Sequence, residues 1–397
     1  MSLEVKPGMF SIAEAKVSWK APSLMAVFSV LVFVAFGILG RREPVEYTVT
    51  ADDAAISLPS ITALSSTVGI VLGIVMMLIS ALAFFRVISK RPVPLWWSMV
   101  FGFIAVVALL GWLAAGDRVP FAFLLANAIV LAIPIIFGGM AGVMSERVGV
   151  VNIAIEGQLL TGAFVAAVVG TLTGNLYAGL VAAMVASALV STILAVFAVR
   201  YLVDQIIVGV VLNVLIIGVT NFLYSQWLTQ DSAGANNPGT FPIVKIPFLS
   251  EIPILGPVVF ENRLTVYLAF LCIPLLWFVL FRTRLGLRAR AVGEYPMAAD
   301  TMGVNVARTR FWWVTTGGAL AGLGGAAFTI GNVGAFGQEM SNGQGFIALA
   351  VVILGRWHPF YMSAAALLFG FSIILRVWAN QVSPGIPTDF IIMVPYL

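Results

Sequence analysis

Residues 146–158 place several polar side chains inside an otherwise apolar part of the sequence. Asn152 and Glu156 stand four residues apart, so a continuous helix would put them on one face. At about 1.5 Å per residue, Glu156 would lie roughly 9 Å inside a membrane-crossing helix. A carboxylate at that depth is costly unless it is paired, protonated or beside water. Gly149 and Gly157 flank the pair, as at helix breaks that line a pathway. Two interpretations stay open: Glu156 lines a pathway, or it caps a helix or pairs with an arginine.

Further polar residues lie among apolar ones in two later parts of the chain. Asn213 and Asn221, eight residues apart, fall roughly on one helix face, where asparagine usually bonds a neighbouring helix rather than lining a pathway. A glycine-rich turn between Gly331 and Gly345 either closes a pathway or is solvated, and it carries Gln338, Glu339, Asn342 and Gln344. The residues predicted to line a substrate pathway are Asn152, Glu156, Asn213 and Gln344.

Residues 293–303 predict a short helix between two membrane segments. Pro296 suits the first helical position, the alanines favour helix, and Gly303 can end it. A short helix outside the membrane, flanked by charged residues, does not stabilise the membrane bundle by itself, so we expect another protein to dock on it. The candidate docking residues are Glu294, Pro296, Ala298, Ala299, Asp300 and Gly303.

Other chemistry is largely excluded by composition. The single cysteine, Cys272, allows no intrachain disulfide, and the single histidine, His358, allows no histidine metal cluster and argues against Ser-His-Asp hydrolysis. No lysine follows a glycine, so the sequence lacks a P-loop for a nucleotide. Gly318 and Gly322 have the spacing that lets two helices approach closely, which explains this glycine-rich stretch better than a dinucleotide turn. We expect no catalytic residue, no metal and no cofactor.

The elements that must position these residues are membrane helices. Of the 397 residues, 61% are hydrophobic and 10% charged, far from the usual composition of a soluble domain. A membrane helix needs about 20 mainly apolar residues. The fold class is therefore all-α, a polytopic transmembrane bundle with about 10–12 membrane segments, some short or broken. The apolar stretches are Ala21–Gly40, Ile61–Val87, Leu95–Ala115, Pro120–Met144, Val150–Thr171, Leu176–Val199, Gln205–Leu228, Leu264–Phe281, Phe311–Gly331, the short Gly345–Gly355, Tyr361–Trp378 and the incomplete Ile386–Leu397.

The distribution of basic residues predicts the orientation. With the N-terminus in the cytoplasm, most of the 21 Lys and Arg residues face inward, as the positive-inside rule requires, so the excess of basic residues does not indicate nucleic-acid binding. Residues 282–310 then form an inner loop with six arginines, and the proline-rich residues 229–262 form an irregular outer loop. The inward residues are Lys6, Lys16, Lys20, Arg86, Lys90, Arg91, Arg147, Arg200, Arg282, Arg284, Arg288, Arg290, Arg308, Arg310 and Arg356.

Three segments resemble those of a known transporter family. The stretch Ala298-Ala299-x-x-x-Gly303 resembles the "EAA…G" loop by which permease subunits of bacterial ABC importers dock on their ATPases, with Met297 where many such loops carry Glu. Residues 145–157 are similar to the "SERxGVVNIxxEG" signature of the branched-chain amino acid/ribose permease superfamily, in its nucleoside-type branch. The stretches 293–303, 317–325 and 343–355 are similar to that branch as well. The resemblance covers residues from Pro120 onward, so we expect an added domain, 1–118, with about three membrane helices, before a permease core, 119–397.

The resemblance implies one subunit of an ATP-driven importer in a bacterial cytoplasmic membrane. Its implied partners are ABC ATPase subunits, a second related permease and an extracytoplasmic substrate-binding lipoprotein. The implied substrate is a nucleoside, with a purine nucleoside the first choice. The alternatives are a monosaccharide or branched-chain amino acid importer, an ion-coupled secondary transporter that uses Glu156, and a membrane scaffold that transports nothing.

Overall fold

The computed structural model describes residues 18–50 and 58–383, which form two compact units. Unit 1 holds the described residues up to Phe121 together with residues 378–383, and unit 2 holds residues 122–377. The final apolar stretch predicted from Ile386 lies outside the described residues.

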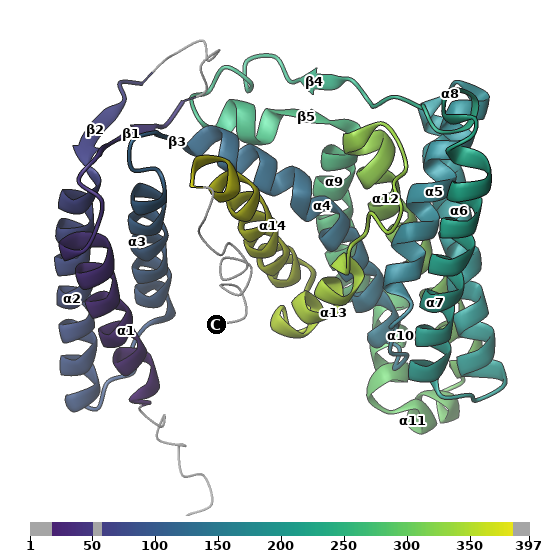
Figure 1. Cartoon of the computed structure of the whole chain (residues 1–397). Helices are drawn as coiled ribbons and strands as arrows, with labels where there is room; N and C mark the ends of the chain where they lie inside the picture. The colour runs from purple at the N-terminus through teal and green to yellow at the C-terminus, as the bar shows by residue number, and fades with distance from the viewer. Residues whose placement is uncertain (1–17, 51–57, 384–397) are drawn as a thin grey trace, which may run out of the picture. The chain divides into compact units, whose positions relative to one another are not determined.

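Unit 1 contains three long apolar helices (Figure 1). They are α1 (Lys20–Leu31) with its π-helical continuation η1 (Val32–Ile38), α2 (Ser65–Ile88) and α3 (Leu95–Leu113). Helix α2 packs closely on η1 at Gly69, where an added Cβ would lie 2.4 Å from the carbonyl oxygen of Phe36. That approach requires glycine, because any larger residue would overlap the backbone of η1.

A small sheet joins the helices of unit 1. Its strands, in the order β2-β1-β3, are β1 (Pro44–Thr48), β2 (Ile61–Leu64) and β3 (Arg118–Pro120). Val45 and Tyr47 are buried on alternate positions of β1, the period of a strand with one covered face. The predicted span beginning at Ile61 therefore starts instead at Ser65, because residues 61–64 pair antiparallel with β1.

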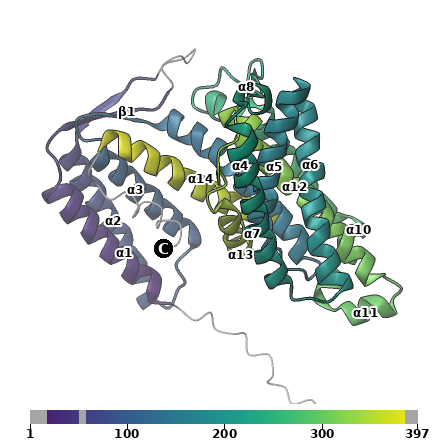
Figure 2. The same ribbon diagram turned by 45° about the vertical axis from the view of Figure 1, so that its right-hand side comes forward.

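Unit 2 is a helical bundle (Figures 1 and 2). Its helices are α4 (Phe121–Glu146), α5 (Ile155–Thr173), α6 (Leu176–Ala195) with η2 (Val196–Arg200), α7 (Gln205–Leu223) with η3 (Tyr224–Leu228), α9 (Leu264–Arg282), α10 (Arg284–Glu294), α11 (Pro296–Thr301), α12 (Val306–Phe328) with η5 (Thr329–Val333), α13 (Gln344–Leu354) and α14 (Pro359–Val382). Asn175 and Asp204 begin α6 and α7 by accepting hydrogen bonds from the first free backbone N–H groups.

Helices α5, α6 and α12 of unit 2 pack closely against one another (Figure 2). An added Cβ at Gly322 of α12 would lie 2.4 Å from the carbonyl oxygen of Ala183 on α6, and one at Gly318 would lie 2.2 Å from Cβ of Ser191. Helix α5 meets both helices nearby, since an added Cβ at Gly162 would lie 2.7 Å from the carbonyl oxygen of Gly322 and 3.1 Å from the hydroxyl of Ser187 on α6. The close approach predicted from the GxxxG spacing is confirmed.

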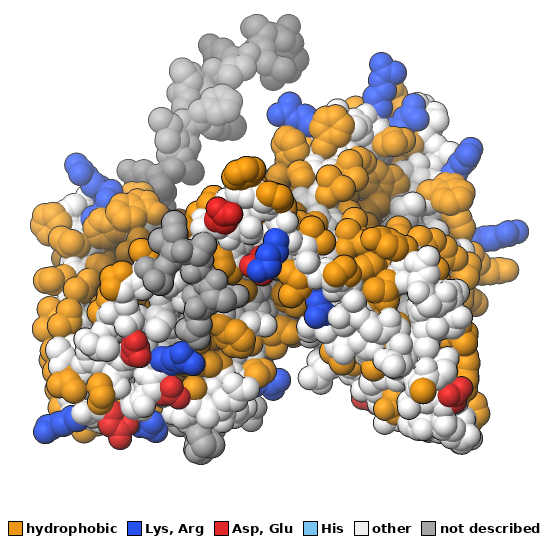
Figure 3. Space-filling view, turned by 90° about the horizontal axis from the view of Figure 1, so that it is seen from above, with side chains coloured by type: hydrophobic (Ala, Val, Ile, Leu, Met, Phe, Trp, Pro, Cys, Tyr) orange, Lys and Arg blue, Asp and Glu red, His pale blue; other side chains and the backbone are white. Residues whose placement is uncertain are grey.

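Among the described residues, ten helices are long and apolar enough to cross a membrane, and α13, with 11 residues, is not. Hydrophobic side chains cover wide areas of the surface seen from above, and charged ones are scattered between them (Figure 3). This confirms the predicted polytopic bundle with one short segment. The role of residues 1–118 as a separate added domain stays a prediction.

The predicted outer loop, 229–262, is mostly irregular but contains three short elements and a π-helical turn. They are α8 (Ser232–Ala235), β4 (Ile243–Lys245), η4 (Gly256–Phe260) and β5 (Glu261–Arg263). Strand β4 pairs antiparallel with β5, and Lys245 forms an ion pair with Glu261. Helix α8 and strand β4 lie at the opposite end of unit 2 from α10 and α11 (Figure 1).

Candidate functional site

The carboxylate of Glu156 caps the short helix α13. One of its oxygens accepts hydrogen bonds from the hydroxyl of Ser341 (2.7 Å) and the N–H of Gly343 (2.9 Å), and the other accepts from the N–H of Gly345 (2.6 Å). These N–H groups belong to the start of α13, which has no backbone acceptors for them and attracts negative charge. Glu156 is 5% exposed. Of the two interpretations of Glu156, this geometry matches the helix cap, and a role in lining a pathway stays a prediction.

Asn152 lies outside any helix, because α5 begins at Ile155. The prediction that Asn152 and Glu156 share one helix face is therefore wrong. The chain leaves α4 through a turn at Gly149, whose φ of +78° ends helical continuity, and returns to helix only after residue 154. The Asn152 amide exchanges two hydrogen bonds with the amide of Gln158, at 3.1 and 3.2 Å, and both side chains are fully buried.

Asn213 joins α7 to the start of α5. Its Oδ1 accepts from the N–H of Gly157 (2.8 Å), and its Nδ2 donates to the carbonyl oxygen of Ile153 (2.8 Å). With 4% of its surface exposed, Asn213 makes the interhelical contact expected of a membrane asparagine. Asn152, Glu156 and Asn213 thus lie around one segment, but their polar atoms are already engaged within the chain.

Two residues of the turn before α13, Gln338 and Glu339, contact α7 and its continuation η3. Asn221 donates from Nδ2 to Glu339 (2.9 Å), and Gln338 donates to the hydroxyl of Ser225 (3.2 Å). Within the described part of the chain, Oδ1 of Asn221 and Oε1 of Gln344 are buried and have no hydrogen-bond donor. Buried acceptors of this kind normally find a partner, so these two oxygens are exceptions within the described residues.

The predicted docking helix is observed as α11. Pro296 is its first residue, Ala299 is buried beneath it, and Gly303, with a φ of +79°, follows its end. Helix α10, directly before it, extends the segment, and Glu294 is its last residue. The outer side of α11 is exposed and partly apolar, with Ala298, Asp300, Tyr295, Met297 and Met302. Exposed apolar side chains at a polar end of the molecule are typical of a protein-binding surface.

Arg147 connects this end of the molecule to α13. Its Nε and one terminal nitrogen donate to the carbonyl oxygen of Trp357 (3.2 and 3.0 Å), and the indole of Trp357 donates to Glu146. Arg147 and Arg290 both lie over the ring of Phe281, at 5.7 and 5.2 Å. Burial lowers the pKa of the Arg147 guanidinium, and the charge of Arg290 lowers it further against an opposing effect of Glu294. Arg147 is thus held among groups of both charges.

His358 follows Trp357 in the turn between α13 and α14. Its ring lies near Phe281, Phe360 and Tyr361, and its Nδ1 is buried without a hydrogen-bond partner among the described residues. Burial lowers the pKa of His358, and the nearby charge of Arg147 lowers it further. Both effects favour the neutral imidazole.

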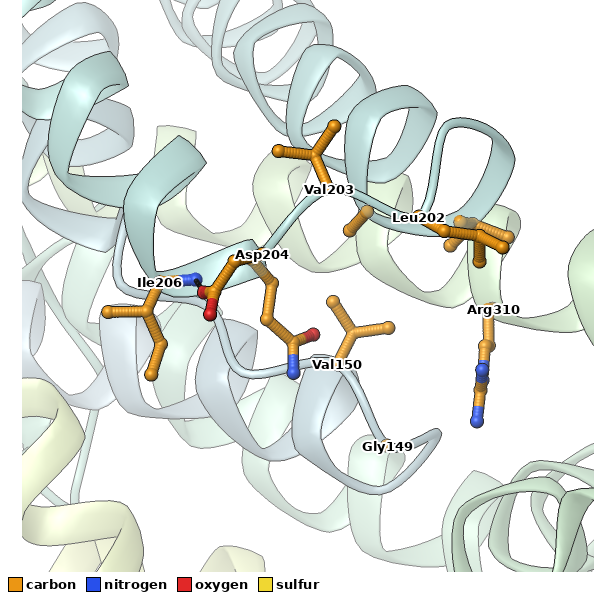
Figure 4. A pocket seen from close by; sticks show the side chains of 10 residues that line it. Gly149, Val150, Leu202, Val203, Asp204, Ile206 and Arg310 are labelled. Atoms are coloured by element: carbon orange, nitrogen blue, oxygen red, sulfur yellow. Dashed lines mark hydrogen bonds between the residues drawn. The ribbon is translucent and has the colours of Figure 1, made fainter.

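Two adjoining pockets open near the start of α12. One, of about 280 Å³, lies between the turn at Gly149, residues 198–206 and Arg310, which extends from α12 beside that turn (Figure 4). The other, of about 420 Å³, lies between α11 and the start of α12, and Val199 and Arg310 line both. In residues 18–50 and 58–383, no three His, Cys, Asp or Glu side chains gather to hold a metal ion. The second pocket continues the exposed surface of α11, since Pro296, Met297 and Asp300 line it.

Sequence reasoning missed Arg147, Trp357 and Ser341 as members of the site. Arg147 was counted only for orientation, and Trp357 lies 210 residues away from it. The only available signal was the similarity of residues 145–157 to a family signature, which includes Arg147.

Comparisons with known proteins agree with this architecture. The family described as "Branched-chain amino acid transport system / permease component" matches residues 124–394. The chain is 38% identical to the guanosine ABC transporter permease protein NupQ of Bacillus subtilis, covering 68% of this chain and 87% of that protein. It is 37% identical to the nucleoside ABC transporter permease protein NupC of Lactococcus lactis (69% and 89%) and 36% identical to the putative glucose ABC transporter permease protein TsgC13 of Haloferax volcanii (66% and 80%). No solved structure matches. The chain belongs to this family of ABC transporter permease subunits, as a multi-pass membrane protein.

Proposed function

We propose that this chain is a permease subunit of an ATP-driven importer for nucleosides, with purine nucleosides as its first substrates. The observation that carries the proposal is the similarity to the guanosine permease NupQ and the nucleoside permease NupC over more than 85% of their lengths. The family match, residues 124–394, includes α11 and α13.

The energy for transport is supplied by a separate ATPase that docks on α11. The exposed apolar residues of α11 and the adjoining pockets support this role, since such a surface needs a covering partner. ATP-dependent closure of the ATPase changes the contacts on α11, and differential contacts of this kind are what shifts a two-state equilibrium. We place α11 and the N-terminus of the chain in the bacterial cytoplasm, in keeping with the positive-inside rule.

The complete importer contains further subunits. We propose a second, related permease beside this chain and an extracytoplasmic lipoprotein that delivers substrate to the end that holds α8 and β4. The chain is also 26% identical to a second guanosine permease, NupP of Bacillus subtilis, which supports a pair of related permeases.

A neutral nucleoside needs hydrogen-bonding groups in its pathway more than fixed charge. Of the predicted pathway residues, Gln344 fits this need best, because its buried Oε1 lacks a donor. Asn221 adds a second such oxygen, and the amino or hydroxyl groups of a nucleoside can supply both donors. Asn152, Glu156 and Asn213 remain in the proposal as residues that shape the pathway wall, since their polar atoms are bound within the chain.

A monosaccharide is the second candidate substrate, because the putative glucose permease TsgC13 is nearly as similar as the nucleoside permeases. A sugar would use the same two oxygens through its hydroxyl groups. The two candidates differ in the base, which only a nucleoside carries.

Uptake by the reconstituted complex tests the function. The chain, its partner permease, ATPase and binding protein are placed in proteoliposomes that contain ATP, and uptake of labelled guanosine, glucose and leucine is compared. We expect guanosine uptake that requires ATP and not an ion gradient, and loss of uptake with normal membrane insertion when Ala298 and Ala299 are deleted. ATP-dependent uptake of glucose alone, or uptake unaffected by the deletion, would contradict the proposal.

A further inference from the structure

Helix α13 is held at its first turn by a residue of α5. The three hydrogen bonds to Glu156 fix the start of the helix, and they fix a turn that is conformationally unusual. Glu339 and Asn342 both adopt left-handed backbone conformations there, with φ of 49° and 43°. Such conformations persist where the surrounding contacts over-determine them.

The last turn of α13 is held in the same way by the end of α4. Arg356 and Trp357 have φ of 52° and 55°, so two consecutive residues other than glycine are left-handed. Arg147 makes two hydrogen bonds to the carbonyl oxygen of Trp357, and Glu146 accepts from its indole. The short segment 146–156 therefore contacts both ends of α13 and stabilises a strained turn at each end.

The same segment also contacts the elements next to the docking helix. An added Cβ at Gly293 of α10 would lie 2.3 Å from the carbonyl oxygen of Arg147, so the two backbones touch. Arg310 of α12 donates from Nε to the carbonyl oxygen of Val148 at 3.0 Å. Packed backbones cannot deform continuously, so a displacement of α10 must displace the turn at residues 147–149 or break these contacts.

We propose that Glu146, Arg147 and Glu156 are positioning residues that clamp α13 at both ends and make it follow the movement of α10 and α11. The inference rests on the proposed function, because it assigns these residues to the coupling between ATP hydrolysis and transport. They act through α13 and touch no substrate. Loss of the clamp separates ATP hydrolysis from solute movement while both the ATPase and the permease stay assembled.

The coupling ratio, solute transported per ATP hydrolysed, tests the proposal in the complete importer reconstituted in proteoliposomes. Arg147→Gln is compared with Arg288→Gln, an exposed arginine of α10 that removes the same charge from the same end of the protein. We expect Arg147→Gln to keep ATP hydrolysis near the wild-type rate and to lower the coupling ratio roughly tenfold, the effect of losing one charged hydrogen-bond contact. Arg147→Lys should recover part of the ratio, because an ammonium reaches one acceptor without the two-pronged geometry. Arg288→Gln should match the wild type.

Hydrogen exchange of the α13 amides gives a second measurement on the purified chain. Arg147→Gln and Glu156→Gln should each speed exchange in residues 344–354, and Arg288→Gln should not. An unchanged coupling ratio in Arg147→Gln, or α13 exchange equal to that of Arg288→Gln, would overturn the proposal. A wild-type complex that transports no nucleoside would instead count against the proposed function, because the exchange measurement needs no transport.

Discussion

Replacement of Asn213 by leucine separates a helix-bridging role from a role in the solute pathway. In the structure, Asn213 satisfies two buried backbone groups of the α5 entry at once, the N–H of Gly157 and the carbonyl oxygen of Ile153. Leucine has the same number of side-chain heavy atoms and the same branching but a larger volume and no polar atom, so Asn213→Leu leaves both groups without a partner. The perturbation removes the hydrogen bonds and adds some bulk, and an Asn→Leu control elsewhere in a membrane helix accounts for the bulk.

The expected cost follows from these two contacts. Leaving one buried backbone group unsatisfied costs about 1–3 kcal/mol, so two groups give about 2–6 kcal/mol. Hydrogen bonds between membrane helices are weaker, at about 0.6 kcal/mol on average and about 1.7 kcal/mol at most, because the unfolded chain in a membrane also finds partners. The smaller energies describe the loss of a side-chain hydrogen bond between helices, and the larger ones describe a buried backbone group left without any partner. We therefore expect a loss of about 2 kcal/mol, which lowers the melting temperature by roughly 4–8 °C on the scale of domains of this size.

Thermal unfolding of the purified chain in detergent measures this loss. Asn127→Leu is the matched control, since Asn127 is a membrane-helix asparagine whose side chain, within the described residues, donates only to Phe123 of its own helix. The control should melt within about 2 °C of the wild type. If Asn213→Leu is as stable as Asn127→Leu but loses transport, then Asn213 contacts solute and the bridging argument is refuted.

Three other predictions concern packing and charge. Gly322→Ala should lower the melting temperature, because the added Cβ would lie 2.4 Å from the carbonyl oxygen of Ala183 and overpacking costs about 1–3 kcal/mol. Gly218→Ala is the control. An added Cβ at Gly218 would have no described atom within 4 Å, so this variant should be neutral or stabilising. Tyr47→Phe should keep or raise the melting temperature, because the Tyr47 hydroxyl is buried without a hydrogen-bond partner in the described structure. Burial also raises the pKa of Tyr47 to about 12, which an absorbance titration of the wild type checks. His358 has a lowered pKa, so the folded state resists protonation. Stability should be full above the unfolded pKa of about 6.5 and decline below it, and the decline between pH 7 and pH 5.5 should be smaller in His358→Asn.

The elements with strong local signals could be predicted from the sequence. The length of the apolar stretches gives the membrane helices, and Pro296 with Gly303 marks both ends of the docking helix. The shortness of the stretch from Gly345 to Gly355 predicts α13 because a run of that length cannot cross a membrane. These predictions depend on neighbours in sequence, so no tertiary contact was needed.

The contacts between distant segments could not be predicted. The spacing of Asn152 and Glu156 is compatible with a helix, but Gly149 ends helical continuity and Asn152 pairs with Gln158 instead. The partners of Glu156 lie 185 to 189 residues away, and a carboxylate in an apolar stretch is compatible with a pathway, a cap or an ion pair. Only the fold selects among them.

The hydrogen bonds of Glu156 also bear on how transport is driven. An ion-coupled transporter needs a membrane carboxylate that gains and loses a proton or cation as the pathway opens. Both oxygens of Glu156 are bound by Ser341, Gly343 and Gly345, and protonation would remove an acceptor from the start of α13. These contacts give Glu156 a structural role at the start of α13. With its oxygens engaged in this way, Glu156 supports the proposal that a partner docked on the exposed surface of α11 supplies the force for solute movement.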